Sequence, residues 1–461
     1  MDSFDKKIKQ LAKDEKWEIP EDIDNRLDDI FYDIEEKRHS KNKLFKVAML
    51  VAMISTLTIT TAFGIEHILE YFSHNKNSIY KPDEKDFVNM GVAVNKTVKD
   101  KNIEFTVDNI SMDDNYINIF YTVKSKKNIK KINEGYKDPY VANPIPDIFM
   151  NGENITPAGF VEHEATYVSN KELKGMRKVD VSETNIKDGE TLEIRVRNIF
   201  ETEGNWSVYV EADKIKAQNK TYNYDINKKA AVNLDYDYKD KIVNIKHNLE
   251  IKKVSISPFA SKITIKEKAS TLFEDWRPIL GYSFALFDEN NKSLDVIDKG
   301  GSGLDENGEI TQSYEFLKAN KDTKSLTLVP IEFDTRIEKQ DLKPQSIDNL
   351  PITFETSEYG KIVFEDIKIS DKEIKYTYYK DGVVPYYPNF WFYDKYGNEI
   401  QVSSLIKESI DRHTGRYTVI LKLEGQENDI KEIKSINKVS TFMNNNMTLR
   451  YDQQIKIDLN K

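Results

Sequence analysis

The pattern of apolar residues along the chain changes its period on either side of one long apolar segment. This segment, Val47–Ile65, reads VAMLVAMISTLTITTAFGI and holds no charged residue. As a helix it would extend about 28 Å, at about 1.5 Å per residue, and so match a hydrocarbon core of roughly 30 Å. The pattern predicts one transmembrane helix, whose apolar side chains include Val47, Leu50, Ile54, Leu57, Ile59 and Ile65.

The charges that flank this segment predict its orientation. Glu66 and Glu70 follow it, whereas five basic residues precede it: Lys37, Arg38, Lys41, Lys43 and Lys46. Basic residues favour the cytoplasmic side, so we expect a single-pass protein of the cell membrane with residues 1–46 inside and residues 66–461 outside. A cleaved secretory signal is the alternative, because Ala62 and Gly64 are small. Such leaders run about 15–30 residues, so we favour the uncleaved anchor.

Residues 1–46 have helical spacing. A first short helix is predicted over Ser3–Lys13, and a second begins near Pro20. The second carries one apolar stripe, at spacings i, i+4, i+7, i+8 and i+11, formed by Ile23, Leu27, Ile30, Phe31 and Ile34. Its other faces are acidic. The stripe can pack the two helices together, or it can bind the groove of a partner that has a basic surface. We favour the partner, because chains below about 40 residues rarely bury a sufficient core.

Beyond the segment, the period becomes that of β-strands. Residues 66–89 are polar, contain Pro82 and are predicted to form an extracellular stalk. Alternation then appears in Ile103-x-Phe105-x-Val107 and continues after a turn at MDDN. The same spacing returns without a gap 257 residues later, around Phe364–Tyr378, and a third copy begins near Leu249. We therefore predict tandem Ig-like β-sandwiches at residues 90–228, 229–345 and 346–461.

Composition excludes several classes of function. The chain has no cysteine, so it forms neither disulfides nor cysteine–metal sites. Its net charge is −10, and nothing in the ectodomain indicates direct binding of nucleic acid. The six histidines are dispersed, and no nucleophile elbow, P-loop or dinucleotide fingerprint occurs. We therefore expect no catalytic residue, no metal site and no cofactor, and do not expect an enzyme.

Two clusters allow a binding interpretation. The acids Asp235, Asp237 and Asp240 could hold a cation, although strand alternation with tyrosine explains them more simply. The aromatic residues of Thr377–Gly397 could bind sugar or peptide. We favour the packing of a sandwich for this cluster as well.

The order of these parts resembles a known family. An acidic helical head with IPEDIDNRLDDIF, a basic juxtamembrane run, one span near residue 50 and the stretch VNKTVKDKNIEFTVDNISMDDNYINIFYTVKS are similar to Gram-positive membrane-anchored anti-sigma-factor-like proteins. Ectodomains of that family carry a domain of unknown function followed by Ig-like modules. The resemblance is best over residues 15–125. The zinc-binding His/Cys arrangement of many other anti-sigma factors is missing here.

The resemblance implies a regulator of transcription. The head would sequester an extracytoplasmic-function sigma factor through its helices, and the ectodomain would sense envelope signals of unspecified nature. Envelope proteases are possible further partners, since they could release the head. The alternative is a membrane-anchored surface protein whose Ig-like domains bind wall polymer or a protein partner, with the head serving only as an anchor.

Overall fold

A computed structural model describes most of the predicted ectodomain. The chain divides into two compact units, Met1–Thr58 and Ile59–Lys461. The described residues are 63–129, 144–157, 162–200, 202–214, 221–239, 241–270, 284–301, 305, 307–334, 336–371, 373–402, 404–423 and 433–459. Both head helices, and residues 47–62 of the predicted span, lie outside them. Within the described ranges, no helix is long and apolar enough to cross a membrane.

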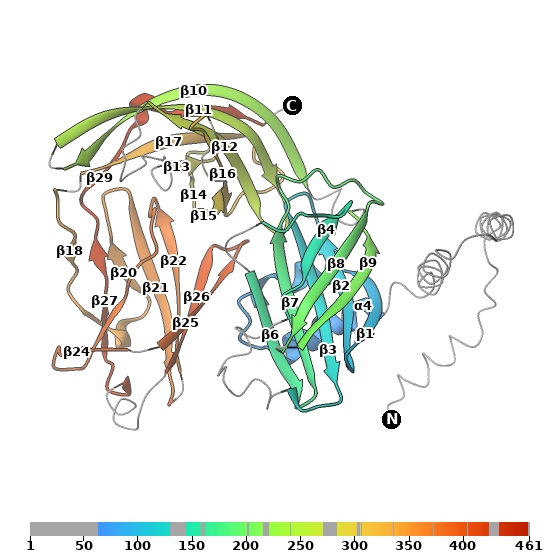
Figure 1. Ribbon diagram of the computed structural model, residues 1–461. Coiled ribbons are helices and arrows are strands. Elements are labelled where there is room, and N and C mark those ends of the chain that lie inside the picture. The colour runs from blue at the N-terminus through green and yellow to red at the C-terminus, as the bar shows by residue number, and fades with distance from the viewer. Residues whose placement is uncertain are drawn as a thin grey trace, which may run out of the picture. The chain divides into compact units, whose positions relative to one another are not determined.

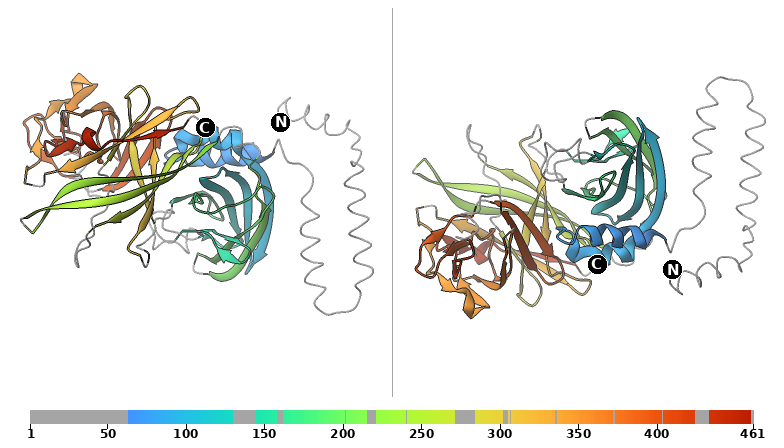
Figure 2. Two further views of the ribbon diagram at one scale, coloured as in Figure 1. Left: turned by 90° about the horizontal axis from the view of Figure 1, so that it is seen from above. Right: turned by 90° about the horizontal axis from the view of Figure 1, so that it is seen from below.

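The first described residues form a helical segment that we call the collar, residues 63–90. It contains α4 (Phe63–His74), the 3₁₀ helix η1 (Lys81–Asp83) and α5 (Glu84–Met90). Ile68, Phe72 and Phe87 are buried, and the Phe87 ring lies 5.5 Å from that of Phe120 in the neighbouring sheet. In both views of Figure 2 the collar, in blue, lies beside the strands that follow it.

The collar corrects the predicted stalk at residues 66–89. Polar residues dominate this segment, but its aromatic residues are spaced so that they gather on one side once the chain turns at residues 75–80. Together they cover the outer face of a sheet. β3 (Tyr116–Ser125) is consequently buried along most of its length, since Ile119 faces the core of the sandwich and Phe120 faces the collar.

Domain 1, residues 92–212, is a sandwich of two antiparallel sheets. One has the order β1-β2-β3-β7-β6 and the other the order β5-β4-β8-β9. Trp206 is fully buried between them and donates from its indole nitrogen to the carbonyl oxygen of Ile103, at 3.0 Å. The other strands are β1 (Val92–Asp100), β2 (Ile103–Met112), β4 (Asp147–Met150), β5 (Glu153–Asn154), β6 (Glu162–Ser169), β7 (Glu172–Asp180), β8 (Thr191–Ile199) and β9 (Thr202–Glu211).

Domain 2 repeats this design. Its sheets have the orders β10-β11-β12-β16-β15 and β14-β13-β17-β29, and β30 also pairs with β17. The strands before residue 334 are β10 (Tyr222–Tyr238), β11 (Lys241–Ile256), β12 (Ser261–Ala269), β13 (Phe284–Phe287), β14 (Ser293–Leu294), β15 (Val296–Gly301), β16 (Ile310–Phe316) and β17 (Ser325–Phe333). Figure 1 shows β10 and β11 as a long curved hairpin.

Domain 3, residues 340–443, has the same two-sheet design as domains 1 and 2. Its sheets have the orders β20-β21-β22-β26-β25 and β19-β27-β23-β24, with the small pair β18-β28 beside them. The strands are β18 (Gln340–Asp341), β19 (Gln345–Ser346), β20 (Ile352–Glu355), β21 (Gly360–Ile369), β22 (Glu373–Gly382), β23 (Trp391–Tyr393), β24 (Glu399–Ile400), β25 (Ser404–Asp411), β26 (Arg416–Leu423), β27 (Lys438–Ser440) and β28 (Phe442–Met443), with the 3₁₀ helix η2 (Ile347–Asn349) after β19.

The register of the strands confirms the internal repeat. In each large sheet, the pairing of the second strand with the third has one register shift, at the same place in the repeat. It lies between Val107 and Asn109 in β2, and between Phe364 and Asp366 in β21, 257 residues later. In β11 the register shift lies between Ile251 and Lys253. The described residues are therefore mainly β-strand in several sheets, consistent with tandem Ig-like sandwiches.

The end of the chain corrects the predicted third domain, residues 346–461. β29 (Met447–Leu449) and β30 (Ile455–Asp458), separated by η3 (Tyr451–Gln453), pair with β17 of domain 2. In domain 1 the equivalent place beside β8 is taken by β9 of the same hairpin. Domain 3 is therefore inserted into domain 2. Alternation at 455–459 predicts a strand, but it carries no information about which sheet the strand joins.

Candidate functional site: a buried ionic junction

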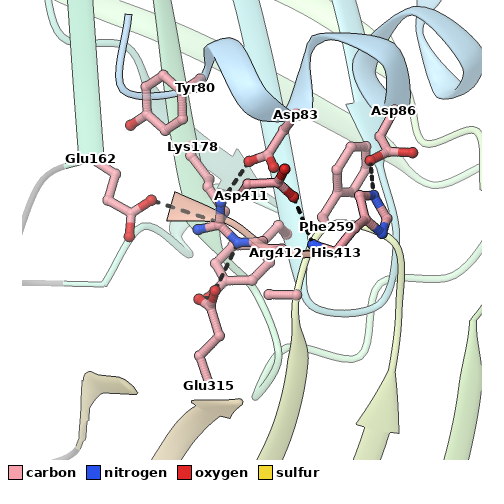
Figure 3. A network of polar contacts seen from close by, with 12 residues as sticks. Tyr80, Asp83, Asp86, Glu162, Lys178, Phe259, Glu315, Asp411, Arg412 and His413 are labelled. Atoms are coloured by element: carbon pink, nitrogen blue, oxygen red, sulfur yellow. Dashed lines mark hydrogen bonds and ion pairs between the residues drawn. The ribbon is translucent and has the colours of Figure 1, made fainter. Parts of the chain in front are cut away.

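The collar meets domains 2 and 3 at the turn between β25 and β26, residues 411–415, which we call the hairpin tip. One carboxylate oxygen of Asp411 accepts from the backbone N–H groups of His413 and Thr414, each at 3.0 Å. Gly415 closes the turn with a φ of +70°, a conformation that side chains with a Cβ rarely adopt. These local contacts hold the tip in shape and project Arg412 and His413 toward the collar (Figure 3).

Arg412 forms the centre of the junction. Its Nη1 lies 2.5 Å from Oδ2 of Asp83 in η1, and its Nε lies 2.7 Å from Oε1 of Glu315 in β16. The Arg412 side chain is 10% exposed, that of Asp83 3% and that of Glu315 0%. One guanidinium group thus joins the collar, domain 2 and domain 3 away from water.

Domain 1 supplies the wall of the junction. The Tyr116 hydroxyl donates to the second oxygen of Glu315, at 3.1 Å. Lys178 Nζ lies 3.9 Å above the Tyr116 ring and 3.7 Å from Oε2 of Glu162. These contacts come from β3, β6 and β7. All three sandwiches and the collar therefore contribute charged or polar groups to one cluster.

Burial controls the electrostatics of Asp83. It raises the pKa of this carboxyl to about 6, and the attraction of Arg412 and Lys178 offsets only part of that increase. Glu315 and Asp86, which are also acidic, raise the pKa further. Although burial opposes its charge, the carboxylates of Asp83, Glu315 and Glu162 hold the pKa of Arg412 well above its usual range. Arg412 is therefore a permanent cation, whereas Asp83 can change its charge near neutral pH.

His413 makes a second contact with the collar, next to Arg412. Its Nε2 lies 2.7 Å from Oδ2 of Asp86 in α5. This hydrogen bond raises the pKa of His413, and the nearby carboxylates of Asp411 and Asp83 act in the same direction. The histidine side chain is 62% exposed. Protons from the medium can therefore reach it directly.

A further buried carboxylate fixes the turn of the collar. Glu164 of β6 accepts from Ser78 Oγ at 2.6 Å and from the backbone N–H of Ile79 at 3.1 Å. Lys407 of β25 lies 3.1 Å from its other oxygen. Glu164 thus links domain 1, the collar and domain 3 at a second point.

Replacing Glu164 with alanine tests this second link. We expect the free energy of unfolding to fall by about 2–4 kcal/mol, because buried donors on Ser78 and Ile79 lose their acceptor. Amide exchange at Ile79 should accelerate. Chemical denaturation and hydrogen exchange measure the two effects. Glu172→Ala is the matched control, since Glu172 forms a more exposed pair with Lys124, and such pairs contribute at most about 1 kcal/mol. Equal losses in both variants would contradict the assignment.

Apolar contacts extend the junction from the collar into domain 2. The ring of Phe259, in the turn after β11, stacks on Phe87 of α5 at 5.3 Å. In the same region Asn115 donates to the carbonyl oxygen of Ala260, at 2.9 Å. The collar is therefore part of the interface between domains 1 and 2, and it does not act as a free linker.

The arrangement suits coupling of domains. Its ionic groups are bonded mainly to one another, and the described residues contain no group of three His, Asp or Glu side chains placed to hold a metal ion. A buried Tyr236–His247–Glu267 chain exists in domain 2, with His247 2.6 Å from Glu267 and 2.9 Å from the Tyr236 hydroxyl. His247 has no exposed surface, so this chain holds three strands together.

The structure describes only some of the residues that the sequence predicted as sites. The partner stripe (Ile23, Leu27, Ile30, Phe31, Ile34) and the predicted span up to Ile59 lie outside the described residues. Ile65, the last residue of the span, lies in α4 and is partly exposed. Asp235 and Asp237 lie on β10, as strand alternation predicted, and Asp240 is not described. In the aromatic cluster of Thr377–Gly397, Tyr378, Phe390 and Phe392 pack in the core of domain 3, as the packing interpretation predicted, whereas Tyr387 and Tyr396 are exposed.

Sequence reasoning missed the junction residues. Arg412 and Asp83 are 329 residues apart, and each looks like an ordinary surface charge in a chain that is 32% charged. One signal was present. β3 reads YINIFYTV, with Tyr116 and Phe120 apolar on the face that should be polar in a sandwich open to solvent. That pattern indicates that another element covers the sheet.

The comparisons with known proteins give two matches to families. Residues 37–125 match a domain of unknown function (DUF4179), and residues 233–356 match a family of unknown function (DUF5643). No curated protein matches the chain. The first match covers the basic juxtamembrane residues, the predicted span, the collar and the strands up to the end of β3.

Two solved structures have some similarity to the chain. The crystal structure of the conserved domain protein from Bacillus anthracis is 17% identical, with 55% of this chain and 81% of that chain covered and a TM-score of 0.36. The N-terminal eight Ig domains of Down Syndrome Cell Adhesion Molecule, isoform 1.30.30, are 9% identical, with coverage of 79% and 47% and a TM-score of 0.14. Neither likeness is close enough to define fold or function.

Proposed function

We propose that this chain is a single-pass membrane regulator, whose head holds an extracytoplasmic-function sigma factor and whose ectodomain passes envelope signals to the head. One observation supports the transmission step above all. The segment that follows the predicted span is a folded collar that contacts all three sandwiches: Ser78 donates to Glu164 of domain 1, Phe87 stacks on Phe259 of domain 2, and Asp83 pairs with Arg412 of domain 3. A rearrangement of any sandwich would therefore act on the chain next to the membrane.

The family match at residues 37–125 supports the same proposal, since it includes both the juxtamembrane residues and the collar. An anchor alone would need no fixed contact between its last residues and distant domains. A flexible stalk would serve a surface-binding protein equally well. The buried links of the collar are therefore better explained by a protein whose outer and inner parts communicate.

The head is tested in the full-length chain, captured from membranes of cells that contain its native partners. We expect a sigma factor to be recovered, and Leu27→Asp with Phe31→Asp to reduce its recovery by at least about tenfold, because buried apolar anchors dominate helix-in-groove interfaces. Asn25→Asp with Tyr32→Asp is the matched control, since it adds the same charge on the opposite face. Recovery of no sigma factor by the unmodified chain would favour the surface-binding alternative.

A further inference from the structure

We propose that the contact between the hairpin tip and the collar is a proton-controlled latch, which closes as the medium outside the membrane acidifies and loosens as it becomes alkaline. The proposal concerns the regulation of the transmission step proposed above, and it rests on that function only for its biological consequence. The latch itself is a property of the ectodomain.

Acidic and basic groups at the tip are unequal in number. Three basic side chains, Arg412, Lys178 and His413, face five carboxylates: Asp83, Asp86, Glu162, Glu315 and Asp411. The other charged groups packed nearby are paired separately, namely Lys81 with Glu84, Lys262 with Asp180 and Lys407 with Glu164. Excess buried negative charge is costly, so a proton bound at the tip favours the closed latch.

The two carboxylate oxygens of Asp83 have different surroundings. Only its Oδ2 is engaged by Arg412, and its Oδ1 is buried without a hydrogen-bond partner among the described residues. A proton can therefore be added to Oδ1 without breaking a hydrogen bond. Asp113, a further carboxylate near Lys178, differs in this respect: it accepts from Ser257 of domain 2 and from two backbone N–H groups. Its environment does not depend on the tip.

The attachment of domain 3 to domain 2 does not depend on the contacts of the tip with the collar. Domain 3 is attached to domain 2 where the chain passes from one domain to the other, and there the Asp334 N–H donates to the backbone carbonyl oxygen of Asn446 at 2.8 Å. The buried pair Lys380–Asp295, at 3.2 Å, also joins the two domains. Among the described residues, the direct contacts of the tip with the collar are those of Arg412 and His413 with Asp83 and Asp86. Outside the tip, domain 3 reaches the collar region through Lys407, which pairs with Glu164, and through Glu373, which accepts from Asn77. Breaking the contacts of the tip leaves the attachment of domain 3 to domain 2 in place.

The direction of the effect follows from the two titrating groups. Asp83 has a pKa of about 6 in the closed latch and an ordinary value of 3.8 once exposed, so its contribution to closure is present at low pH and lost as pH rises through about 6. The pKa of His413 is raised above its ordinary 6.5, so its contribution is complete below that value and lost above the raised one. Both groups favour closure on acidification.

The size of the effect can be measured in the full-length chain, which has no native cysteine and so accepts two unique spin labels. Lys85→Cys in α5 and Lys368→Cys in β21 are exposed positions on the collar and on domain 3. The spin labels give the ratio of molecules with the closed label distance to molecules with the open one. This population ratio is measured in urea at the midpoint of latch opening. From about pH 7.5 to about pH 5 we expect this ratio to rise about tenfold from Asp83 alone, with His413 adding to it.

Variants assign the effect to its groups. Asp83→Asn should remove the dependence around pH 6, His413→Gln should remove the dependence at higher pH, and the combination should give a flat profile. Glu365→Gln is the matched control, because Glu365 pairs with the exposed Arg416, which directly follows the tip and does not contact the collar residues Asp83 and Asp86, and it should keep the full profile. The latch is overturned if the population ratio of the unmodified chain does not change with pH. It is also overturned if the double variant keeps the pH profile of the unmodified chain, or if the labels show no opening before global unfolding. Recovery of the sigma factor is a separate measurement, so each proposal can fail alone.

Discussion

Arg412→Ala is expected to lower the free energy of unfolding by about 3–5 kcal/mol, because it leaves Asp83 and Glu315 buried without their shared cation. Chemical denaturation of the full-length chain measures the loss. Hydrogen exchange should locate it in the collar and in β16. Both elements contribute a carboxylate that only Arg412 bridges to the hairpin tip.

Arg416→Ala is the control for this experiment. Arg416 lies on the same hairpin and pairs with Glu365 through two contacts of 2.7 Å, but its side chain is 52% exposed. We expect a change of at most about 1 kcal/mol. Arg412→Met combined with Asp83→Leu and Glu315→Met should recover much of the loss, because no charge is then buried alone. A loss in Arg412→Ala no larger than in Arg416→Ala would show that the junction does not bear on stability.

Ile457→Ala is expected to destabilise domain 2 by about 2–5 kcal/mol, although residue 457 follows domain 3 in the sequence. Its side chain is fully buried and packs in the core formed by both sheets of domain 2. Hydrogen exchange should show lost protection in β13 and β17 while β21 and β22 keep theirs. Removing residues 447–461 should have the same effect in a more severe form, because β17 then loses both β29 and β30.

Lys456→Ala is the matched control for the C-terminal strand. Lys456 is exposed on β30, and its backbone rather than its side chain accepts from Lys228. We expect a change within about 0.5 kcal/mol. If Ile457→Ala reduced protection in domain 3 and left domain 2 unchanged, the insertion of domain 3 into domain 2 would be wrong.

Local patterns of apolar and polar residues predicted much of the fold. Alternation in Ile103-x-Phe105-x-Val107 places every second side chain on one face, and this requires nothing beyond the chain itself. The spacing shared at 257 residues predicted that the same pair of strands recurs, and the structure adds a register shift at the same place in both copies. The anchor and the partner stripe of the head stay predictions, because they fall outside the described residues.

The junction could not be predicted in this way. A charged residue in an exposed turn, such as Arg412, has the same local sequence whether it faces water or a carboxylate from another domain. Residues 66–89 likewise have the composition of a linker, yet Phe72, Tyr80 and Phe87 make them part of a core. Sequence neighbours do not distinguish the two outcomes, because burial depends on which distant surface is available.

The sequence alone thus determined the strands, their repetition and the absence of cysteine chemistry, since each follows from residue type and spacing along a few neighbouring positions. The tertiary structure decided the rest. It determined that the C-terminal strand joins domain 2, that the collar covers β3, and that Asp83, Glu315 and Arg412 meet without water. These results depend on contacts between segments hundreds of residues apart, where the free energy comes from complementary surfaces and from the exclusion of solvent, and neither is present until the domains pack.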